Sequence, residues 1–200
     1  MGGLPLFTEV LRADVLGNPY IARRMPMQED RGNGSTSSKS QRLANSENKI
    51  RTMDIDVNAP VITRDEILID APLGTIWSLQ TDISSWSEWL PDIDASTLEG
   101  PLEAGRVFRW QTYGLSIEST IQEIDAPRRI VWSGLAQGIT AIHAWTMTPS
   151  EDRVLVHTEE SWDGEPVRAQ PEEMQQALDG SLRAWLQSLK HKAEAQAQGR

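Results

Sequence analysis

Six short segments with alternating apolar and polar residues follow one another between residues 95 and 162. Turn residues separate them, among them Gly100-Pro101, Gly114, Ala126-Pro127 and Gly138. Connections this short join antiparallel neighbours and leave no room for the crossover helices that parallel strands require. The pattern therefore predicts an antiparallel meander, with strands over residues 95–98, 106–113, 115–124, 128–134, 139–148 and 154–162.

Helical signals flank this meander on both sides. An earlier strand, 62–69, ends at Ala71-Pro72, and two short helices are expected after it, over 73–80 and from the capping box Ser85–Glu88 to Pro91. After the meander, Pro171 and the two glutamates that follow it suit a helix N-terminus. One apolar stripe at helical spacing then consists of Met174, Leu178, Leu182, Trp185 and Leu189. We expect an α+β domain in which about seven strands form a curved antiparallel sheet, closed by the long C-terminal helix around an apolar cavity.

The N-terminal part of the chain differs in kind from the rest. Residues 1–52 carry a net charge of +3, whereas the remainder carries −13. Residues 28–48 contain almost no apolar side chain, so they cannot offset the entropy lost on ordering. We expect residues 1–60 to be a disordered extension and 61–200 to be the domain. The extension is either a targeting or partner-binding arm or a product of a misassigned start, with Met53 as the alternative.

Composition narrows the range of partners and chemistries. The net charge of −10 disfavours nucleic acid, because phosphate binding requires a basic surface. The chain has no cysteine, which excludes disulfides and thiolate chemistry. We find no secretory signal and no apolar stretch of membrane-spanning length, and therefore expect a cytoplasmic protein that does not insert into membranes.

The order of elements and several local strings resemble the START / Bet v 1-like (SRPBCC) superfamily, in particular its polyketide cyclase/dehydrase branch. The resemblance covers about 61–193, and its strings are Asp70-Ala71-Pro72, Ile76-Trp77, Trp86, Trp89-Leu90-Pro91, Gly105 to Trp110, Ile124 to Trp132 and Ala144-Trp145. It implies the helix-grip fold and an internal cavity for a hydrophobic small molecule. The superfamily also contains lipid carriers, receptors, chaperone activators and toxins, so the resemblance indicates fold more narrowly than function.

Strand parity indicates which side chains share the concave face, since neighbouring residues on a strand point to opposite sides. The larger and more apolar set on each strand is assigned to that face, which leaves Leu155, His157, Glu159 and Ser161 pointing outward. Tryptophans inside can serve as core filling or as rigid cavity walls; the resemblance favours walls. The expected ligand-binding residues are Trp86, Trp89, Phe108, Trp110, Thr112, Ile117, Ser119, Trp132, His143, Trp145, Thr158, Glu160, Trp162, Leu178, Leu182 and Trp185.

Two of these residues could carry acid/base chemistry. His143 is the only histidine expected inside, and an imidazole there could move protons near neutral pH. Glu160 is expected on the same face, where a buried carboxyl is costly unless it is paired or protonated. The structural alternatives are a hydrogen-bonded core histidine and, for Glu160, either an ion pair with an arginine such as Arg109 or Arg183 or exposure at the cavity mouth. No metal motif or nucleotide-binding motif is found, so we expect no metal and no cofactor.

Three functions remain open from the sequence. The first is enclosure of an aromatic, polyketide-like ligand, with cyclisation or dehydration assisted by His143 or Glu160. The second is non-catalytic carriage of a lipid or metabolite. The third, which the resemblance alone suggests, is binding of a protein partner in the manner of Hsp90 activators; any such partner is unknown.

Overall fold

The structure is a computed structural model that describes residues 53–199. The expected disorder of 1–52 lies outside the described residues. In chain order the elements are β1 (Val61–Ile69), α2 (Leu73–Thr81), the 3-10 helix η1 (Ile83–Glu88), β2 (Ile93–Leu98), β3 (Val107–Thr112), β4 (Leu115–Asp125), β5 (Arg129–Ala136), β6 (Ile139–Ser150), β7 (Arg153–Asp163), α3 (Glu165–Ala169) and α4 (Pro171–Gln198).

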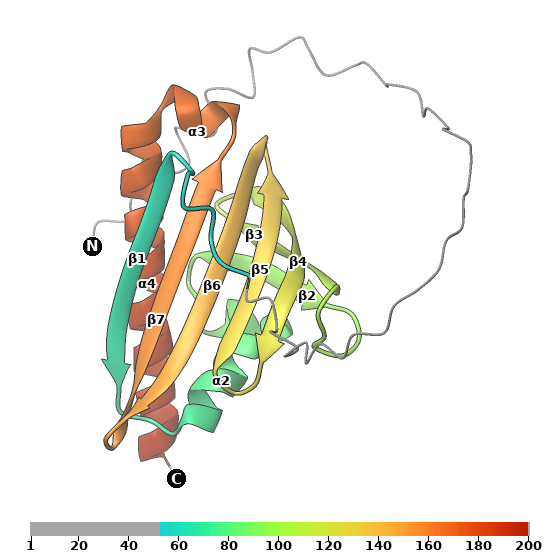
Figure 1. Cartoon of the computed structure of the whole chain (residues 1–200). Helices are drawn as coiled ribbons and strands as arrows, with labels where there is room; N and C mark the ends of the chain where they lie inside the picture. Colours follow the sequence, from blue (N-terminus) through green and yellow to red (C-terminus); the bar gives the residue numbers. More distant parts are fainter. Residues whose placement is uncertain (1–52, 200) are drawn as a thin grey trace, which may run out of the picture.

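The seven strands form one antiparallel sheet in the order β1-β7-β6-β5-β4-β3-β2. Consecutive strands from β2 to β7 are neighbours, as the short connections predicted, and β1 closes the series beside β7. The sheet curves around α4, which runs behind β1, β7 and β6 in Figure 1. This is the helix-grip arrangement, and the predicted fold class is confirmed. The short helix α3 was not predicted.

Two tight hairpins lie at one end of the sheet. Tyr113-Gly114 joins β3 to β4, and Gln137-Gly138 joins β5 to β6; all four residues have positive φ. Two-residue turns of this kind match the twist of the strands that they join. The second hairpin is held from outside by Gly164, whose backbone lies so close to the Gly138 carbonyl that a β-carbon would overlap it.

Polar side chains of α4 cover the free edge of β1 at two places. Near its start, the Gln175 side-chain amide accepts from the Ile62 N–H at 3.2 Å and donates to the Ile62 carbonyl at 3.0 Å. Near its end, Lys190 Nζ donates to the Leu68 carbonyl at 2.6 Å, and the Asp70 N–H donates to Glu194 at 2.9 Å. These contacts satisfy strand groups that would otherwise be exposed at a sheet edge. They also fix the position of α4 along the sheet.

Residues 53–60, which the sequence analysis assigned to the extension, lie against the convex face of the sheet. Ile55 is only 5% exposed and packs with Val131 and Ala144. The Met53 N–H donates to Glu123 at 2.8 Å. Ser161, expected to point outward, is buried on this face because the Asp56 N–H donates to its hydroxyl. The packed region therefore includes the segment from Met53 onward.

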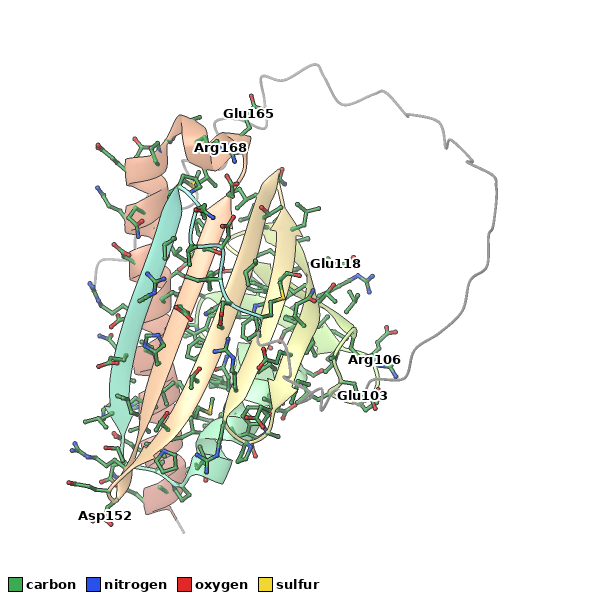
Figure 2. The ribbon with its side chains drawn as sticks, in the orientation of Figure 1. Glu103, Arg106, Glu118, Asp152, Glu165 and Arg168 are labelled. Carbon is green, nitrogen blue, oxygen red and sulfur yellow. The ribbon has the colours of Figure 1, made fainter. Side chains whose placement is uncertain are left out.

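Most charged side chains lie on the outside of the described region, although Glu123 and Arg129 form a largely buried pair. Figure 2 shows Glu103, Arg106, Glu118, Asp152, Glu165 and Arg168 directed away from the sheet. Pairs such as Arg109–Glu118, at 2.7 Å, are well exposed on both sides. Exposed pairs of this kind contribute little to stability, so the fold depends on the interior. No helix in the described region is long and apolar enough to cross a membrane.

The edge contact of Gln175 leads to a test. Replacing Gln175 with Ala leaves the Ile62 N–H and C=O without partners, which costs about 1 kcal/mol of unfolding free energy. The expected result is a lower urea midpoint with an unchanged denaturant slope. Gln176→Ala, at the exposed neighbouring position, should leave the midpoint within error; equal effects of the two variants would contradict the role of Gln175.

Candidate functional site

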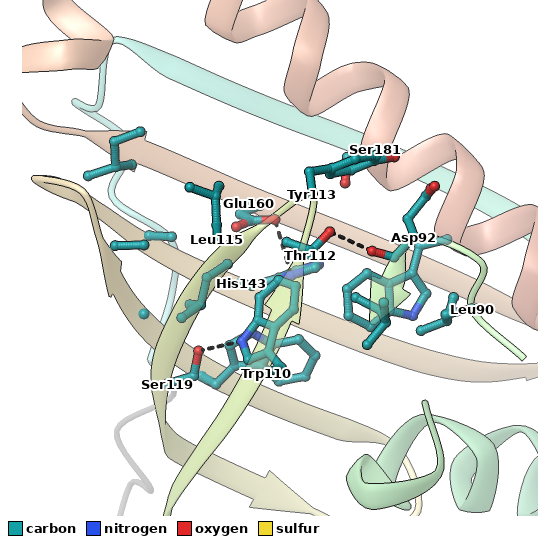
Figure 3. A pocket seen from close by; sticks show the side chains of 18 of the residues that line it. Leu90, Asp92, Trp110, Thr112, Tyr113, Leu115, Ser119, His143, Glu160 and Ser181 are labelled. Carbon is teal, nitrogen blue, oxygen red and sulfur yellow. Dashed lines mark hydrogen bonds and ion pairs between the residues drawn. The ribbon is translucent and has the colours of Figure 1, made fainter. Parts of the chain in front are cut away.

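A cavity of about 90 Å³ lies between the concave face of the sheet and α4. It is reached from the end of the sheet that carries the two hairpins, and Figure 3 shows the side chains around it. Its lining consists of Leu90, Pro91, Asp92, Ile93, Trp110, Thr112, Tyr113, Leu115, Ile117, Ser119, Trp132, Gly134, Leu135, Ala136, Gln137, Ile139, Ala141, His143, Glu160, Trp162, Ser181, Ala184, Trp185 and Ser188.

The cavity exists because small residues face one another across the interior. On the sheet, Ser119, Gly134 and Ala141 are consecutive partners across β4, β5 and β6. A β-carbon on Gly134 would lie 3.0 Å from the Ser119 hydroxyl, so this position has little room for a larger residue. The facing wall of α4 presents Ser181, Ala184 and Ser188. Larger side chains at these places would fill the space, because protein interiors are otherwise close-packed.

The structure brings nine of the sixteen expected ligand-binding residues to the cavity: Trp110, Thr112, Ile117, Ser119, Trp132, His143, Glu160, Trp162 and Trp185. The other seven do not line it: Trp86, Trp89, Phe108, Trp145, Thr158, Leu178 and Leu182. Most of these seven are core residues, as with Trp86, whose ring packs edge-on against Phe108 at 5.6 Å and Trp185 at 5.0 Å. Strand parity identified the side chains on the concave face of the sheet. It could not distinguish those that line the cavity from those that pack in the core.

Sequence reasoning missed the residues at the mouth and the small residues of the helix. Tyr113 and Gln137 belong to hairpin turns, which the sequence analysis treated only as punctuation. Ser181, Ala184 and Ser188 recur at helical spacing beside Trp185, and this was a readable signal for a wall of small residues.

His143 and Glu160 are direct partners across β6 and β7, and they form the polar centre of the lining. His143 Nδ1 lies 3.1 Å from Glu160 Oε2, and its Nε2 lies 2.8 Å from the Thr158 hydroxyl. The Trp162 indole N–H donates to the other carboxyl oxygen of Glu160 at 2.7 Å. Thr158, although outside the cavity, therefore holds the imidazole from behind.

Burial makes both members of this pair neutral near pH 7. Loss of solvation raises the pKa of Glu160 from 4.5 to about 8, with the Trp162 hydrogen bond acting in the opposite direction. Loss of solvation lowers the pKa of His143 from 6.5 to about 3. The 3.1 Å contact is therefore a hydrogen bond between a carboxylic acid and an imidazole, and Glu160 does not form the alternative ion pair with Arg109 or Arg183. Those arginines pair with Glu118 and Asp65 instead.

The hydrogen-bond chain can hold its protons in two ways. In one, Glu160 donates to Nδ1, Nε2–H donates to Thr158, and the Thr158 hydroxyl donates to the Ala144 carbonyl, 3.4 Å away. In the other, Thr158 donates to Nε2 and Nδ1–H donates to Glu160, which frees the carboxyl proton to face the cavity. A change of imidazole tautomer connects the two arrangements.

A second polar place lies at the mouth, where Asp92 and Tyr113 meet. The Tyr113 hydroxyl hydrogen-bonds to Asp92, and burial, this hydrogen bond and the negative charge together raise the Tyr113 pKa. The Thr112 hydroxyl donates to the Asp92 backbone carbonyl at 2.7 Å. Figure 3 shows Asp92 and Glu160 at separate parts of the lining.

Metal ligation has no support within the described region, since no three of its His, Asp or Glu side chains are grouped to hold an ion. His143 and Glu160 contact each other, and the nitrogen that also contacts Glu160 belongs to the Trp162 indole, which is a hydrogen-bond donor and not a metal ligand.

Comparison with known proteins gives the family. The model of the family described as polyketide cyclase / dehydrase and lipid transport matches residues 60–194. The chain belongs to this family. The match extends from the last residue before β1 to within α4 and so includes every residue of the cavity. No curated protein matches the chain.

Solved structures of similar fold come from several bacteria. A hypothetical protein of Helicobacter pylori aligns with a TM-score of 0.63 at 18% identity, over 80% of this chain and 99% of its own. A START superfamily protein from Mycobacterium smegmatis gives 0.59 at 13% identity, over 67% and 97%. The Zhui aromatase/cyclase from a Streptomyces species gives 0.59 at 15% identity, over 66% and 93%. At these identities the similarity establishes the fold.

The buried pair predicts a specific dependence of stability on pH. Between pH 6.5 and about 8, native Glu160 keeps a proton that the unfolded chain has lost, so stability falls as pH rises. The expected loss is about 1 kcal/mol per pH unit. Between pH 4.5 and 6.5, uptake of a proton by the unfolded histidine balances the glutamate, and below that range stability falls as pH falls.

The measurement is urea unfolding from about pH 4 to about pH 9. Glu160→Gln should remove the fall above pH 6.5, because glutamine keeps the hydrogen bonds and does not titrate. Glu159→Gln is the matched control, since Glu159 pairs with the exposed Arg64 on the opposite face of β7. A fall that persists in Glu160→Gln would show that another group causes it.

Proposed function

We propose that this protein encloses a small hydrophobic ligand in the cavity under α4 and catalyses a cyclisation or dehydration in which the Glu160–His143 pair moves the proton. The observation that carries the proposal is a hydrogen-bonded acid–imidazole pair that opens on a tryptophan-lined cavity. Removing a carboxyl and an imidazole from water is costly. A protein that needed only a packed interior would be more stable with apolar residues there.

The geometry supports acid/base work by Glu160. A group whose pKa lies near the working pH transfers protons efficiently in both directions, and the Glu160 pKa of about 8 meets that condition. In a dehydration, Glu160 gives its proton to the leaving hydroxyl group, and the carbon–oxygen bond breaks with release of water. The resulting carboxylate, held by His143 and Trp162, takes the proton from the neighbouring carbon as the double bond forms. One proton is given and one recovered, so the pair returns to its starting state.

Positioning supplies the rest of the proposed catalysis. Trp110, Trp132 and Trp185 are rigid walls that hold a flat ligand against the pair. Aligning the reacting atoms removes much of the entropic part of the barrier. The cavity of about 90 Å³ is small beside the roughly 300 to 1,000 Å³ of pockets for drug-sized ligands, which favours a ligand of no more than one ring. A ligand with several rings requires the mouth to widen.

Carriage of a ligand without reaction is the second candidate, and the family description, which includes lipid transport, favours it. A carrier and an enzyme differ in the role that they require of Glu160. In a carrier, substitutions in the lining change affinity alone. In an enzyme, one substitution removes turnover and leaves binding.

Native mass spectrometry of the purified protein, followed by organic extraction, tests for a ligand. A copurified aromatic or acyl compound supports enclosure and identifies the class to assay. An empty protein whose tryptophan indole signals in NMR spectra also fail to shift with 2-phenylethanol, indole and short acyl compounds would overturn the proposal.

Filling the cavity should block binding. Ala184→Leu adds three carbon atoms to a side chain that faces the cavity, and the affinity for 2-phenylethanol is expected to fall at least about tenfold because little room remains. Titration followed by the indole signals measures it. Gln187→Leu, on the exposed side of the same helix, should bind as the wild type does. Unchanged binding by Ala184→Leu would place the ligand elsewhere.

Removing the acid should stop turnover and spare binding. With the copurified compound, or a β-hydroxy ketone built on it, Glu160→Gln is expected to lower kcat about 100-fold or more, as loss of a general acid does. The dissociation constant should change less than about threefold, since glutamine keeps the shape of the side chain. Glu159→Gln should match the wild type. Equal turnover in Glu160→Gln would end the catalytic role of the carboxyl.

A further inference from the structure

The lining of the cavity contains ionisable acids and no side chain that is positively charged near pH 7. Among its lining residues the ionisable acids are Asp92, Tyr113 and Glu160, and none is Lys or Arg. His143, the one potential cation in the lining, is kept neutral by burial. The molecule as a whole carries −10, which adds to a negative potential at the mouth. A carboxylate or phosphate inside would have no cation to replace its lost water, and such a charge is costly to bury.

Asp92 is the only one of these acids placed to receive a charged group from solvent. It is half-buried, directly after the exposed Pro91, whereas Glu160 lies deeper and is occupied by His143 and Trp162. No Lys, Arg or His of the described residues forms an ion pair with the Asp92 side chain; its partner there is the Tyr113 hydroxyl, which is uncharged. The carboxylate thus faces the cavity without a countercharge.

Tyr113 makes this contact from the first position of its two-residue hairpin, where its backbone conformation is strained. Its φ of 49° lies in the left-handed region, which is unfavourable for a bulky residue and usual for Asn, Asp or Gly at this position of a two-residue hairpin. Strain of this kind persists where the surrounding structure holds it, often at binding sites. The result is an aromatic ring and a carboxylate side by side at the mouth, and a cation is attracted by both.

We propose that the ligand of this cavity carries a protonated amine, which pairs with Asp92 beside Tyr113 at the mouth while its apolar ring lies among the tryptophans, and that the site rejects anionic ligands. This inference rests on the proposed function, since it assumes that the cavity binds a ligand. It adds the charge class of that ligand and a residue that selects it. The amine lies at the mouth, so Glu160 remains free for the proton transfer proposed above.

The test compares three probes with one ring and one two-carbon arm, namely 2-phenylethylamine, 2-phenylethanol and phenylacetate. Affinities are measured at about pH 7 by isothermal titration calorimetry and by the indole signals. The amine is expected to bind at least about tenfold more tightly than the alcohol, because an ion pair and a cation–π contact are added. Phenylacetate is expected to bind at least about tenfold more weakly than the alcohol, because its charge is buried without a partner.

Two variants test whether the preference for the amine depends on Asp92. Asp92→Asn should bring the amine to the affinity of the alcohol or below, with the alcohol itself unchanged within about twofold, since an ion pair needs the charge and an uncharged ligand does not. Asp94→Asn removes the same charge two residues further along, at an exposed position outside the lining, and should keep the amine preference.

The outcomes separate this inference from the proposed function. Phenylacetate binding as tightly as the amine, or equal affinities of all three probes, would overturn the selection by charge and leave enclosure of a hydrophobic ligand intact. An amine preference that survives in Asp92→Asn would overturn the role of Asp92. Failure of all three probes to bind would count against both proposals.

Discussion

The packing of Trp185 from α4 into the concave face of the sheet is the contact on which the interior depends. Its ring lies 5.0 Å from Trp86, 5.7 Å from Trp145 and 5.8 Å from His143, centroid to centroid. It is at once a core residue, on the side of Trp86 and Trp145, and a wall of the cavity. Its indole N–H donates to the buried Gln80 side chain, which fixes the ring edge as well as its face. Core and site therefore share one side chain, and neither can be rearranged without the other.

The polar pair is placed by the sheet, and its cost is reduced by neutrality. Because His143 and Glu160 are register partners, their side chains leave the same face at neighbouring points. Trp162 and Thr158, each two residues from Glu160 on β7, provide the remaining hydrogen bonds. A charged pair here would lose far more solvation. An arrangement of uncharged donors and acceptors costs less to bury, and the proposed acid/base role uses the proton that this arrangement retains on Glu160.

The sequence predicted the parts that depend on periodicity. Turn residues marked the strand ends, and the parity of the strands placed Glu160 and His143 on one face with Trp132 and Trp162. It could not predict contacts that depend on distance in three dimensions. The sequence pattern predicts that Ser161 is exposed on the outer face, whereas in the structure the segment containing Asp56 covers it. The Asp92–Tyr113 contact is a second example, because it joins two residues that are distant in sequence. The sequence also could not show which tryptophans line the cavity and which pack in the core, because tryptophan is suited to both places.

The side chains that tie α4 to β1 lie on either side of the stretch that faces the cavity. Gln175 and Lys190 fix the helix at both ends, so the part between them cannot slide along the sheet. The depth of the cavity is then set by the sizes of Ser181, Ala184 and Ser188, while the backbone stays in place. During evolution, exchanges at these three positions could reshape the space for a different ligand at little expense in folding, and a lineage could change what it binds while its architecture persists.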